Sequence, residues 1–461
     1  MIPQRPLFYS PYKAVRTPPV VWHPDGSALE ELAISKKVAA DSIRVSGAEM
    51  VEVFTGNIHH RQIKAATGGM VDRAEFDDFA LALLHHFGIE PQSTLAATAE
   101  RAWRHTLTDP VWVDPAPLVE ARLALYGGLA FALDTRRCGQ TVTWDVRSAY
   151  GSVMAKGRFP SGAARKVTRY GKRYPSIWLV RWTAPEGIRI PIIPWRTEEG
   201  DTCWLRGSGE SWVSGEEIEY ARRIGYSIEP IRGWEWEERI SPFGPFIRKV
   251  GQALKDPSFA QLWKSFPNVL YGRFAAAPTG TELFVPRRDR DCEGAVPVGD
   301  GERYWLRGAS ASHRLRQPAW AVFITARMRL RLHETAYACG IGRVIAGHTD
   351  SLTLRGWDRA PMREGPGIGD WRIESRYHQY RALGPTVSVG RLVGSGWRGR
   401  GLRRGASLSA VWQANPESIP EDRWSGMASG KRHRAGRSLS WRLLPDGTVC
   451  PRRLDSGVIV D

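Results

Sequence analysis

A short alternating segment that ends in a carboxylate restricts the fold of this chain more than any other stretch of its sequence. In residues 141–146 the apolar side chains Val142, Trp144 and Val146 alternate with smaller or polar ones. This period of two is typical of a β-strand with one buried face, so we expect Asp145 to point away from the core. A carboxylate where a strand ends can bind a hard cation such as Mg2+ through its oxygens. An isolated Asp in this position can equally be a solvated residue at a strand edge.

A second carboxylate is predicted at the tip of a hairpin far downstream. Residues 344–346 are a short apolar run, residues 347–351 are turn-like, and Leu352 and Leu354 resume an alternating pattern. This is the pattern of a β-hairpin, with Asp350 at or beside its tip. Two carboxylates that converge from distant strands repel each other unless cations lie between them, as in two-metal sites where the ions are about 3.5–4 Å apart.

A stripe of polar and aromatic residues lies between these two segments. If residues 260–275 are helical, Lys264, Asn268 and Tyr271 fall at i, i+4 and i+7 and share one face, while apolar residues cover another. A cation, an amide and an aromatic ring then lie side by side. The other interpretation of this stripe is an ordinary solvated helix face.

Three segments, in this order, resemble the conserved motifs of family B DNA polymerases, in particular those of the viral, plasmid and protein-primed branch. DVRSAY at 145–150 resembles motif A (D-x-x-S-L-Y-P), KSFPNVLYG at 264–272 resembles motif B (K-x-x-x-N-S-x-Y-G), and GHTDS at 347–351 resembles motif C (x-D-T-D-S). LYGG at 125–128 resembles the upstream Y-x-G-G element, and residues 202–238 resemble the family's palm insert. The resemblance covers roughly residues 85 to 410 and implies a template-directed DNA polymerase of a phage, plasmid or other mobile element.

The resemblance implies an α+β fold of the polymerase right-hand type. Its parts would be an antiparallel palm sheet, helical fingers, a reduced thumb and a small N-terminal α/β region. We expect residues 1–120 to form the reduced N-terminal region, residues 121–370 the palm and fingers with insertions, and residues 371–461 a thumb-like basic C-terminal region.

The resemblance also implies the roles of individual residues. Asp145 and Asp350 would hold two Mg2+ ions, for which Mn2+ can substitute, with the carbonyl of Val146 as a further ligand. Lys264 would neutralise phosphate charge in the transition state, and Tyr150 would exclude a ribose 2′-OH. The implied nucleotide-binding residues are Val146, Ser148, Ala149, Tyr150, Lys264, Asn268 and Tyr271, with backbone N–H groups of residues 146–150 facing the triphosphate. The implied template and primer contacts are Gly127, Gly128, Tyr271 and Gly272.

Several departures from the family pattern keep other functions open. His348 replaces the first Asp of motif C, Leu125 replaces the Tyr of Y-x-G-G, and residues 384–390 lack a K-x-Y element. An imidazolium beside two cations is unfavourable, so we expect His348 to be neutral if the metal ions bind. One alternative is a catalytically degenerate polymerase fold that acts only as a DNA-binding or replication-accessory protein. Another is a hydrolase with a two-carboxylate metal site, which the stripe at Lys264 argues against.

Composition and charge are consistent with a nucleic-acid partner. Among 461 residues, 65 are Lys or Arg and 48 are Asp or Glu, which gives a net charge of +17 and suits a protein that follows a phosphate backbone. A G+C-rich genome would also enrich Arg. We expect primer-template DNA and dNTPs as partners, with a terminal protein or another replication protein as a further one. No apolar run reaches the ~18 residues of a membrane span, so we expect a cytoplasmic protein without a membrane partner.

Four further features predict local structure. Residues 1–120 contain no D-x-E, so we expect no proofreading exonuclease, and the acidic cluster at 72–78 is interpreted as the first turn of a helix. Helices are predicted at 77–87, at 95–106 and, opened by Pro318, at 318–340. In the third, the arginines at 327, 329 and 331 alternate with apolar residues, so at most two can share a solvent face. Ser214 and Glu217 form a capping box that begins another helix.

Overall fold

The fold is described from a computed structural model of the chain. The structure describes, with side chains, residues 78–91, 95–114, 116–171, 175–196, 202–275, 317–357, 362–402 and 407–413, and elsewhere only the backbone of residues 73–77 and of several short strands. The chain divides into two compact units. The first unit consists of Met1–Val111, Tyr150–Gly157 and Ser241–Phe274, and the second of Trp112–Ala149, Arg158–Ile240 and Ala275–Asp461.

The second unit contains a seven-stranded antiparallel sheet in the order β20-β19-β18-β6-β17-β16-β5. Its strands are β5 (Ala130–Ala132), β6 (Thr141–Val146), β16 (Val344–His348), β17 (Ser351–Arg355), β18 (Trp371–Gly384), β19 (Val387–Leu392) and β20 (Trp397–Arg400). The predicted strand at 141–146 and the predicted hairpin at 344–354 are therefore confirmed. Because β6 pairs with β17, the segment that ends in Asp145 lies directly beside the hairpin that carries Asp350.

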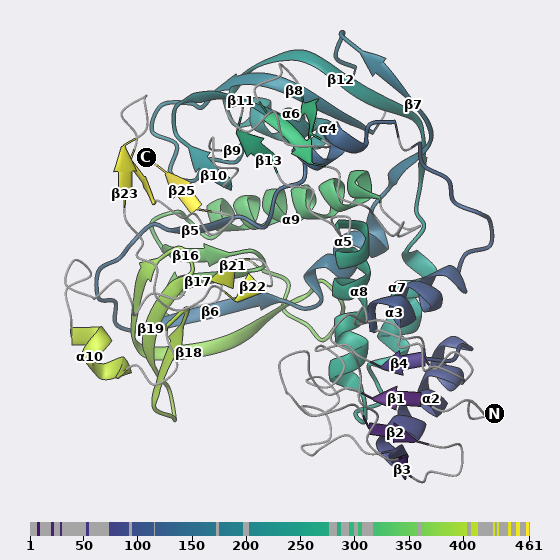
Figure 1. Cartoon of the computed structure of the whole chain (residues 1–461). Helices are drawn as coiled ribbons and strands as arrows, with labels where there is room; N and C mark the ends of the chain where they lie inside the picture. Colours follow the sequence, from purple (N-terminus) through teal and green to yellow (C-terminus); the bar gives the residue numbers. More distant parts are fainter. Residues whose placement is uncertain are drawn as a thin grey trace. The chain divides into compact units, whose positions relative to one another are not determined.

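A long helix, α9 (Pro318–Ala338), packs in the interior of the second unit. In Figure 1 it lies between the seven-stranded sheet and a layer formed by α6 (Gly215–Arg223) and a four-stranded antiparallel sheet. That sheet has the order β11-β8-β12-β7 and consists of β7 (Phe159–Val167), β8 (Ser176–Thr183), β11 (Ser208–Ser214) and β12 (Ser227–Ile240). Since α9 is covered on both sides, even its charged residue Arg329 is fully buried.

The capping box predicted at the start of α6 is present. The Ser214 hydroxyl accepts a hydrogen bond from the Glu217 amide, and the Glu217 side chain accepts one from the Ser214 amide. Ile218 and Ala221 are fully buried on its apolar face. Gly225, with φ of 97°, follows the C-cap, a conformation that costs glycine little because it has no Cβ.

Helices dominate the described part of the first unit. They are α2 (Arg73–Phe87), α3 (Leu95–Arg104), α5 (Ala149–Lys156), α7 (Gly244–Ala253) and most of α8 (Ala260–Ala275). The core is aromatic: Trp263 of α8 stacks on Phe79 with ring centroids 5.7 Å apart, and Phe266 lies 5.4 Å from Phe87. This core holds α8 against α2.

The other elements are short. The remaining helices are α4 (Leu118–Leu123) and α10 (Leu408–Gln413), the latter packed on β19 through a cluster that contains Trp412. The remaining strands are β1 (Leu7–Tyr9), β2 (Val20–Trp22), β3 (Ala28–Leu29), β4 (Glu52–Phe54), β9 (Pro194–Arg196), β10 (Thr202–Leu205), β13 (Phe284–Pro286), β14 (Ala295–Val298), β15 (Arg303–Leu306), β21 (Met427–Ala428), β22 (Lys431–Arg432), β23 (Trp441–Leu443), β24 (Val449–Pro451) and β25 (Val458–Val460).

The compact units do not follow the order of the chain, because each is assembled from separate segments. The seven-stranded sheet also extends across the predicted boundary at residue 370, since β18 begins at Trp371 and pairs with β6. The three-part division at residues 120 and 370 stays a prediction, as does the thumb-like role of residues 371–461. Within the described residues, no helix is long and apolar enough to cross a membrane.

Candidate active site

Asp145 lies on β6, and Asp350 lies in the turn before the neighbouring strand β17, at the same end of the seven-stranded sheet. Asp145, on β6, is directly opposite Ser351 of β17, the residue after Asp350. The Val146 amide donates a 3.0 Å hydrogen bond to the Asp350 carbonyl, which ties the two chain segments together. Asp350 is in the two-residue turn between β16 and β17, since His348 pairs with Ser351. The structure therefore brings together the two carboxylates that the sequence analysis singled out.

The two carboxylates influence each other electrostatically. Burial raises the pKa of Asp350 to about 7, and the nearby negative charge of Asp145 contributes to this rise, while the cation of Arg400 acts in the opposite direction. A raised pKa means that the surroundings stabilise the negative charge of the carboxylate less well than water does. Metal binding would supply the missing positive charge.

Asp145 already has one cationic partner, which sequence reasoning did not find. Arg372, directly opposite it on β18, donates from Nε and Nη2 to Asp145 Oδ2 at 3.0 and 2.9 Å. The Asp145 side chain is only 18% exposed. Both bonds end on Oδ2, so the guanidinium orients the carboxylate through this oxygen and Oδ1 takes no part in these two bonds.

His348 is neutral in this environment. Burial, and then the cation of Arg400, lower its pKa to about 4. The Arg400 guanidinium lies 2.8 Å from His348 Nδ1, with Nη2 as the donor, so the ring proton must be on Nε2. A neutral His348 beside bound metal ions stays a prediction, but burial and the cation of Arg400 on β20 already disfavour the imidazolium.

Both turns at this end of the sheet carry a strained non-glycine residue. Ser148, after β6, has φ of 48°, and Thr349, before Asp350, has φ of 56°. Such conformations cost on the order of 1–3 kcal/mol each and concentrate at functional sites. The Ser148 hydroxyl is buried and has no hydrogen-bond partner among the described residues, so it is available to a polar ligand.

The backbone amides of motif A are only partly available to a triphosphate. The Val146 amide is bonded to the Asp350 carbonyl, and the Arg147 amide donates a 2.9 Å hydrogen bond to the Asp370 carbonyl. The expectation that all amides of residues 146–150 face the triphosphate is therefore wrong for these two. Both amides donate to backbone carbonyls of segments that adjoin the sheet. The roles of Ser148, Ala149 and Tyr150 stay predictions.

The donor atoms at this end of the sheet suit a magnesium ion. They are carboxylate oxygens, a backbone carbonyl at Val146 and the orphaned Ser148 hydroxyl. Mg2+ is typically bound by one or two carboxylates, with substrate phosphates and water completing its octahedron. No group of three or more His, Cys, Asp or Glu side chains in the described ranges could hold a metal. Within these ranges, the side-chain carboxylates of the candidate metal site are therefore those of Asp145 and Asp350.

The motif B residues occupy one face of α8, as the stripe predicted. Lys264 and Tyr271 are half-buried and Asn268 is exposed, whereas Trp263, Phe266 and Leu270 are fully buried on the other face. The helix continues through Pro267. Gly272, near its end, is exposed, and a Cβ there would meet no atom within 4 Å.

The candidate sugar-selecting residue contacts motif B within the first unit. The Tyr150 ring, at the start of α5, lies 4.5 Å from the Tyr271 ring, centroid to centroid, at an angle of 52°. Tyr150, the last residue of motif A, therefore contacts Tyr271 of motif B within this unit. An aromatic pair of this kind favours particular orientations of both rings.

The 125–128 segment (Leu125, Tyr126, Gly127 and Gly128) lies against the turn that carries Asp350. A Cβ on Gly128 would lie 2.6 Å from Thr349 Oγ1, so only glycine fits at this position. The Thr349 amide donates a 2.8 Å hydrogen bond to the Leu129 carbonyl. This close approach explains why a glycine is needed at Gly128.

Sequence reasoning missed how charged residues pair around these motifs. Arg372 and Arg400 are on strands β18 and β20, for which no strand was predicted, and Arg329 and Glu217 form a buried ion pair between α9 and α6. The alternation of charged and apolar residues after Trp371 was the one available signal for β18. Nothing in the spacing of the α9 arginines showed which of them is buried.

Comparison with known proteins gives the same family as the motifs. Residues 118–295 match the family model of DNA polymerase type B, organellar and viral. The chain is 29% identical over 284 residues to a probable DNA polymerase of Neurospora intermedia, and 31% identical over 111 residues to the primer-independent DNA polymerase PolB of Escherichia coli. These matches cover 54% and 21% of this chain, but only 29% and 13% of the two relatives.

Solved structures support the fold. The chain is similar to phi29 DNA polymerase in an orthorhombic crystal form, with a TM-score of 0.60 and 19% identity over 82% of this chain and 77% of that one. It is also similar to phi29 DNA polymerase in a complex with primer-template DNA and incoming nucleotides, with a TM-score of 0.59 and 19% identity over 90% and 80% of the two chains. The predicted α+β polymerase fold is thereby confirmed, and residues 118–295 are similar to the organellar and viral family of type B DNA polymerases.

Proposed function

We propose that this protein is a template-directed DNA polymerase that adds dNMP units to a primer 3′ end. The observation that carries the proposal is the convergence of Asp145, on β6, with Asp350, in the turn that leads into the adjacent strand β17. It is supported by the family match and by the Lys264, Asn268 and Tyr271 face of α8. The proposed setting is the replication or repair of a phage, plasmid or other mobile element in the cytoplasm.

In this proposal, the Asp145 and Asp350 carboxylates and the Val146 carbonyl would hold two Mg2+ ions, or Mn2+ in their place. Bound divalent cations would lower the barrier for the attacking 3′-oxygen and stabilise the leaving phosphate oxygen. Asp350 must lose its proton to act as a ligand, and Arg372 keeps Asp145 oriented through Oδ2.

Other residues would act on the nucleotide and the DNA. Lys264 would neutralise phosphate charge, with Asn268 and the Ser148 hydroxyl as further polar contacts. Tyr150, packed on Tyr271, would lie where a ribose 2′-OH would otherwise go. The template and primer contacts in this proposal are Gly127, Gly128, Tyr271 and Gly272.

The decisive experiment is primer extension on a primed DNA template with Mg2+ or Mn2+. We expect Asp145→Asn and Asp350→Asn each to reduce dNTP incorporation by at least about a thousandfold while primer-template binding persists. Asp134→Asn is a matched control, because Asp134 is a carboxylate at the opposite end of the sheet, paired with Arg136 and Arg355. Full activity of either site variant would contradict the proposal.

Sugar selection can be tested in the same assay. Tyr150→Ala should admit ribonucleotides, whereas Tyr150→Phe, which keeps the ring, should continue to exclude them. Unchanged selectivity of Tyr150→Ala would remove Tyr150 from its proposed role and leave the metal site unaffected.

The rival proposal is a catalytically degenerate polymerase fold that binds DNA as an accessory protein. His348 in motif C and the Arg372 guanidinium on Asp145 favour it. Primer-template binding by the wild-type protein without any incorporation would establish this rival. Because one relative is named a primer-independent polymerase, the assay should compare a DNA primer, no primer and a candidate terminal protein.

A further inference from the structure

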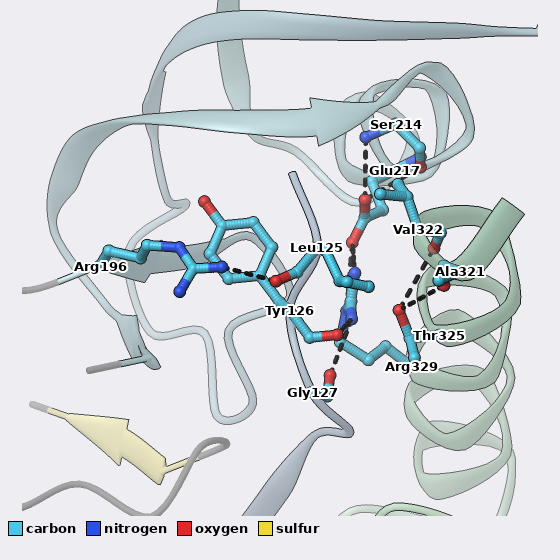
Figure 2. A network of polar contacts seen from close by, with 10 residues as sticks. All are labelled: Leu125, Tyr126, Gly127, Arg196, Ser214, Glu217, Ala321, Val322, Thr325 and Arg329. Carbon is cyan, nitrogen blue, oxygen red and sulfur yellow. Dashed lines mark hydrogen bonds and ion pairs between the residues drawn. The ribbon is translucent and has the colours of Figure 1, made fainter. Parts of the chain in front are cut away.

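A fully buried arginine connects α9 to the 125–128 segment. Arg329 and Glu217 are both 0% exposed, and Arg329 donates from Nη2 and Nε to Glu217 Oε1 at 2.6 and 3.2 Å. The Arg329 Nη1 group donates to the carbonyls of Tyr126 and Gly127 at 3.1 and 2.8 Å. Figure 2 shows the guanidinium between the Glu217 carboxylate and the backbone of the segment.

The ion pair is costly to bury, so stability alone does not explain it. Taking two charges out of water costs several kcal/mol per ion, and an apolar pair of similar volume is often as stable or more stable. Both oxygens of the carboxylate are engaged here, because Glu217 Oε2 accepts from the Ser214 amide and hydroxyl at 3.0 and 2.9 Å. The pair therefore gives a directional contact that an apolar pair could not give, namely a guanidinium nitrogen aimed at two consecutive carbonyls.

A second guanidinium holds the same segment. Arg196 of β9 donates a 2.5 Å hydrogen bond from Nη2 to the Leu125 carbonyl, and its guanidinium lies 4.6 Å from the centroid of the Tyr126 ring. Three consecutive carbonyls, those of Leu125, Tyr126 and Gly127, are thus bonded to side chains of two distant elements. No helix or strand includes these residues, so arginines supply the hydrogen bonds that regular structure supplies elsewhere.

The held segment leads directly to the candidate metal site. Gly128 is in close contact with Thr349, and Thr349 precedes Asp350. A shift of the segment would therefore press on the turn that presents this carboxylate. Near an active site, a displacement of about 1 Å can cost a hundredfold in rate.

We propose that Arg329, paired with Glu217 and assisted by Arg196, is a positioning residue that holds the 125–128 segment against the turn of Asp350. The held segment presents Gly127 and Gly128 to the template strand, a step that rests on the proposed polymerase function. Arg329 does not touch substrate; it acts through the backbone that it fixes.

The test uses a charge-neutral double variant of the full-length protein. Arg329→Met with Glu217→Gln removes both buried charges and the two carbonyl contacts, while the glutamine side chain introduced in the second change can still serve the capping box. The matched control is Arg327→Met with Glu216→Gln. That pair joins the same two helices through bonds of 2.8 and 2.5 Å but does not touch the 125–128 segment.

Two measurements distinguish a positioning role of Arg329 from a general contribution to the stability of the fold. Hydrogen exchange in the peptide covering residues 124–131 should accelerate about tenfold or more in the test variant, since two hydrogen bonds to it are lost, and should not change in the control. The dissociation constant for primer-template should rise about tenfold, with thermal unfolding midpoints of the test and control variants similar. If the double variant does not fold, Arg196→Gln replaces it, because Arg196 is only half-buried. This variant should also accelerate exchange in the 124–131 peptide and raise the dissociation constant for primer-template.

Unchanged exchange in the 124–131 peptide of a folded test variant would overturn the positioning role. Accelerated exchange with an unchanged dissociation constant would overturn the template step alone. If the wild-type protein did not bind primer-template, the proposed polymerase function would fail, whereas the exchange result would still decide the role of Arg329.

Discussion

At the scale of single residues, Asp145 and Asp350 show how a sheet can hold two acidic groups close together. Asp145 is compensated by Arg372 on the neighbouring strand β18, whereas Asp350 is buried and its pKa is raised to about 7. In the absence of metal, the second carboxylate therefore carries a proton more readily than an ordinary Asp. Asp145 thus has a cationic partner within the sheet, whereas a bound cation would favour the charged form of Asp350.

This arrangement predicts an unusual pH dependence of stability in the metal-free protein. An unfolded Asp titrates near 3.9, whereas folded Asp350 titrates near 7. Between these values the native state binds more protons than the unfolded state, so the free energy of unfolding should fall as pH rises, on the order of 2 kcal/mol for this group after solvent screening. Urea unfolding with a chelator at pH 5 and pH 7.5 measures this fall. Asp350→Asn should show a smaller fall, and equal falls would contradict the assignment.

The glycine at 128 gives a second prediction for a single residue. Gly128→Ala should destabilise the protein by about 1–3 kcal/mol, since its Cβ would overlap with Thr349. Gly139→Ala is the control, because a Cβ at Gly139 meets no atom within 4 Å. Adding Thr349→Gly to the Gly128→Ala variant should restore part of the thermal midpoint. The absence of any loss in Gly128→Ala would show that the two chain segments separate easily.

At the scale of secondary-structure elements, helices α6 and α9 form the support behind the candidate site. Glu217 at the start of α6 has two tasks, the capping box with Ser214 and the ion pair with Arg329. The helix start and the arginine that holds the 125–128 segment therefore share one carboxylate. A substitution in the capping box should therefore also affect Arg329 and the carbonyls that it binds.

We expect Ser214→Ala to lower the free energy of unfolding by about 1 kcal/mol, the usual cost of a lost N-cap. Ser208→Ala, at the exposed start of β11, is the control and should stay within about 0.5 kcal/mol of wild type. Chemical denaturation of the three proteins measures both effects. A loss in Ser214→Ala no larger than in Ser208→Ala would mean that Glu217 is held by Arg329 alone.

At the scale of the whole molecule, the net charge of +17 makes electrostatics the main expected source of DNA affinity. A protein that makes about six to ten phosphate contacts loses about 10³–10⁵ in affinity between about 50 and 200 mM salt. We expect a steep loss of this kind in fluorescence anisotropy with primer-template. The same slope is expected for unrelated DNA sequences, because phosphate contacts carry no sequence information. An affinity independent of salt would contradict this prediction.

Local patterns in the sequence determined several of the elements that carry the motifs. The alternation around Trp144, the hairpin at Asp350, the capping box at Ser214 and the helix opened by Pro318 are short-range signals that depend on neighbouring residues, and all four are present in the structure. The resemblance to type B DNA polymerases and the expected α+β fold followed from motifs of the same local kind.

Only the tertiary structure decided how charges are paired. That Arg329 is the buried arginine of α9, that Arg372 faces Asp145, and that Gly128 touches Thr349 all depend on contacts between residues far apart in the chain. Sequence spacing describes one element at a time, whereas the burial of a charge depends on every element packed around it. For this protein the sequence by itself determined which residues form the motifs, and the packing of α6, α9 and the seven-stranded sheet decided which charged residues meet.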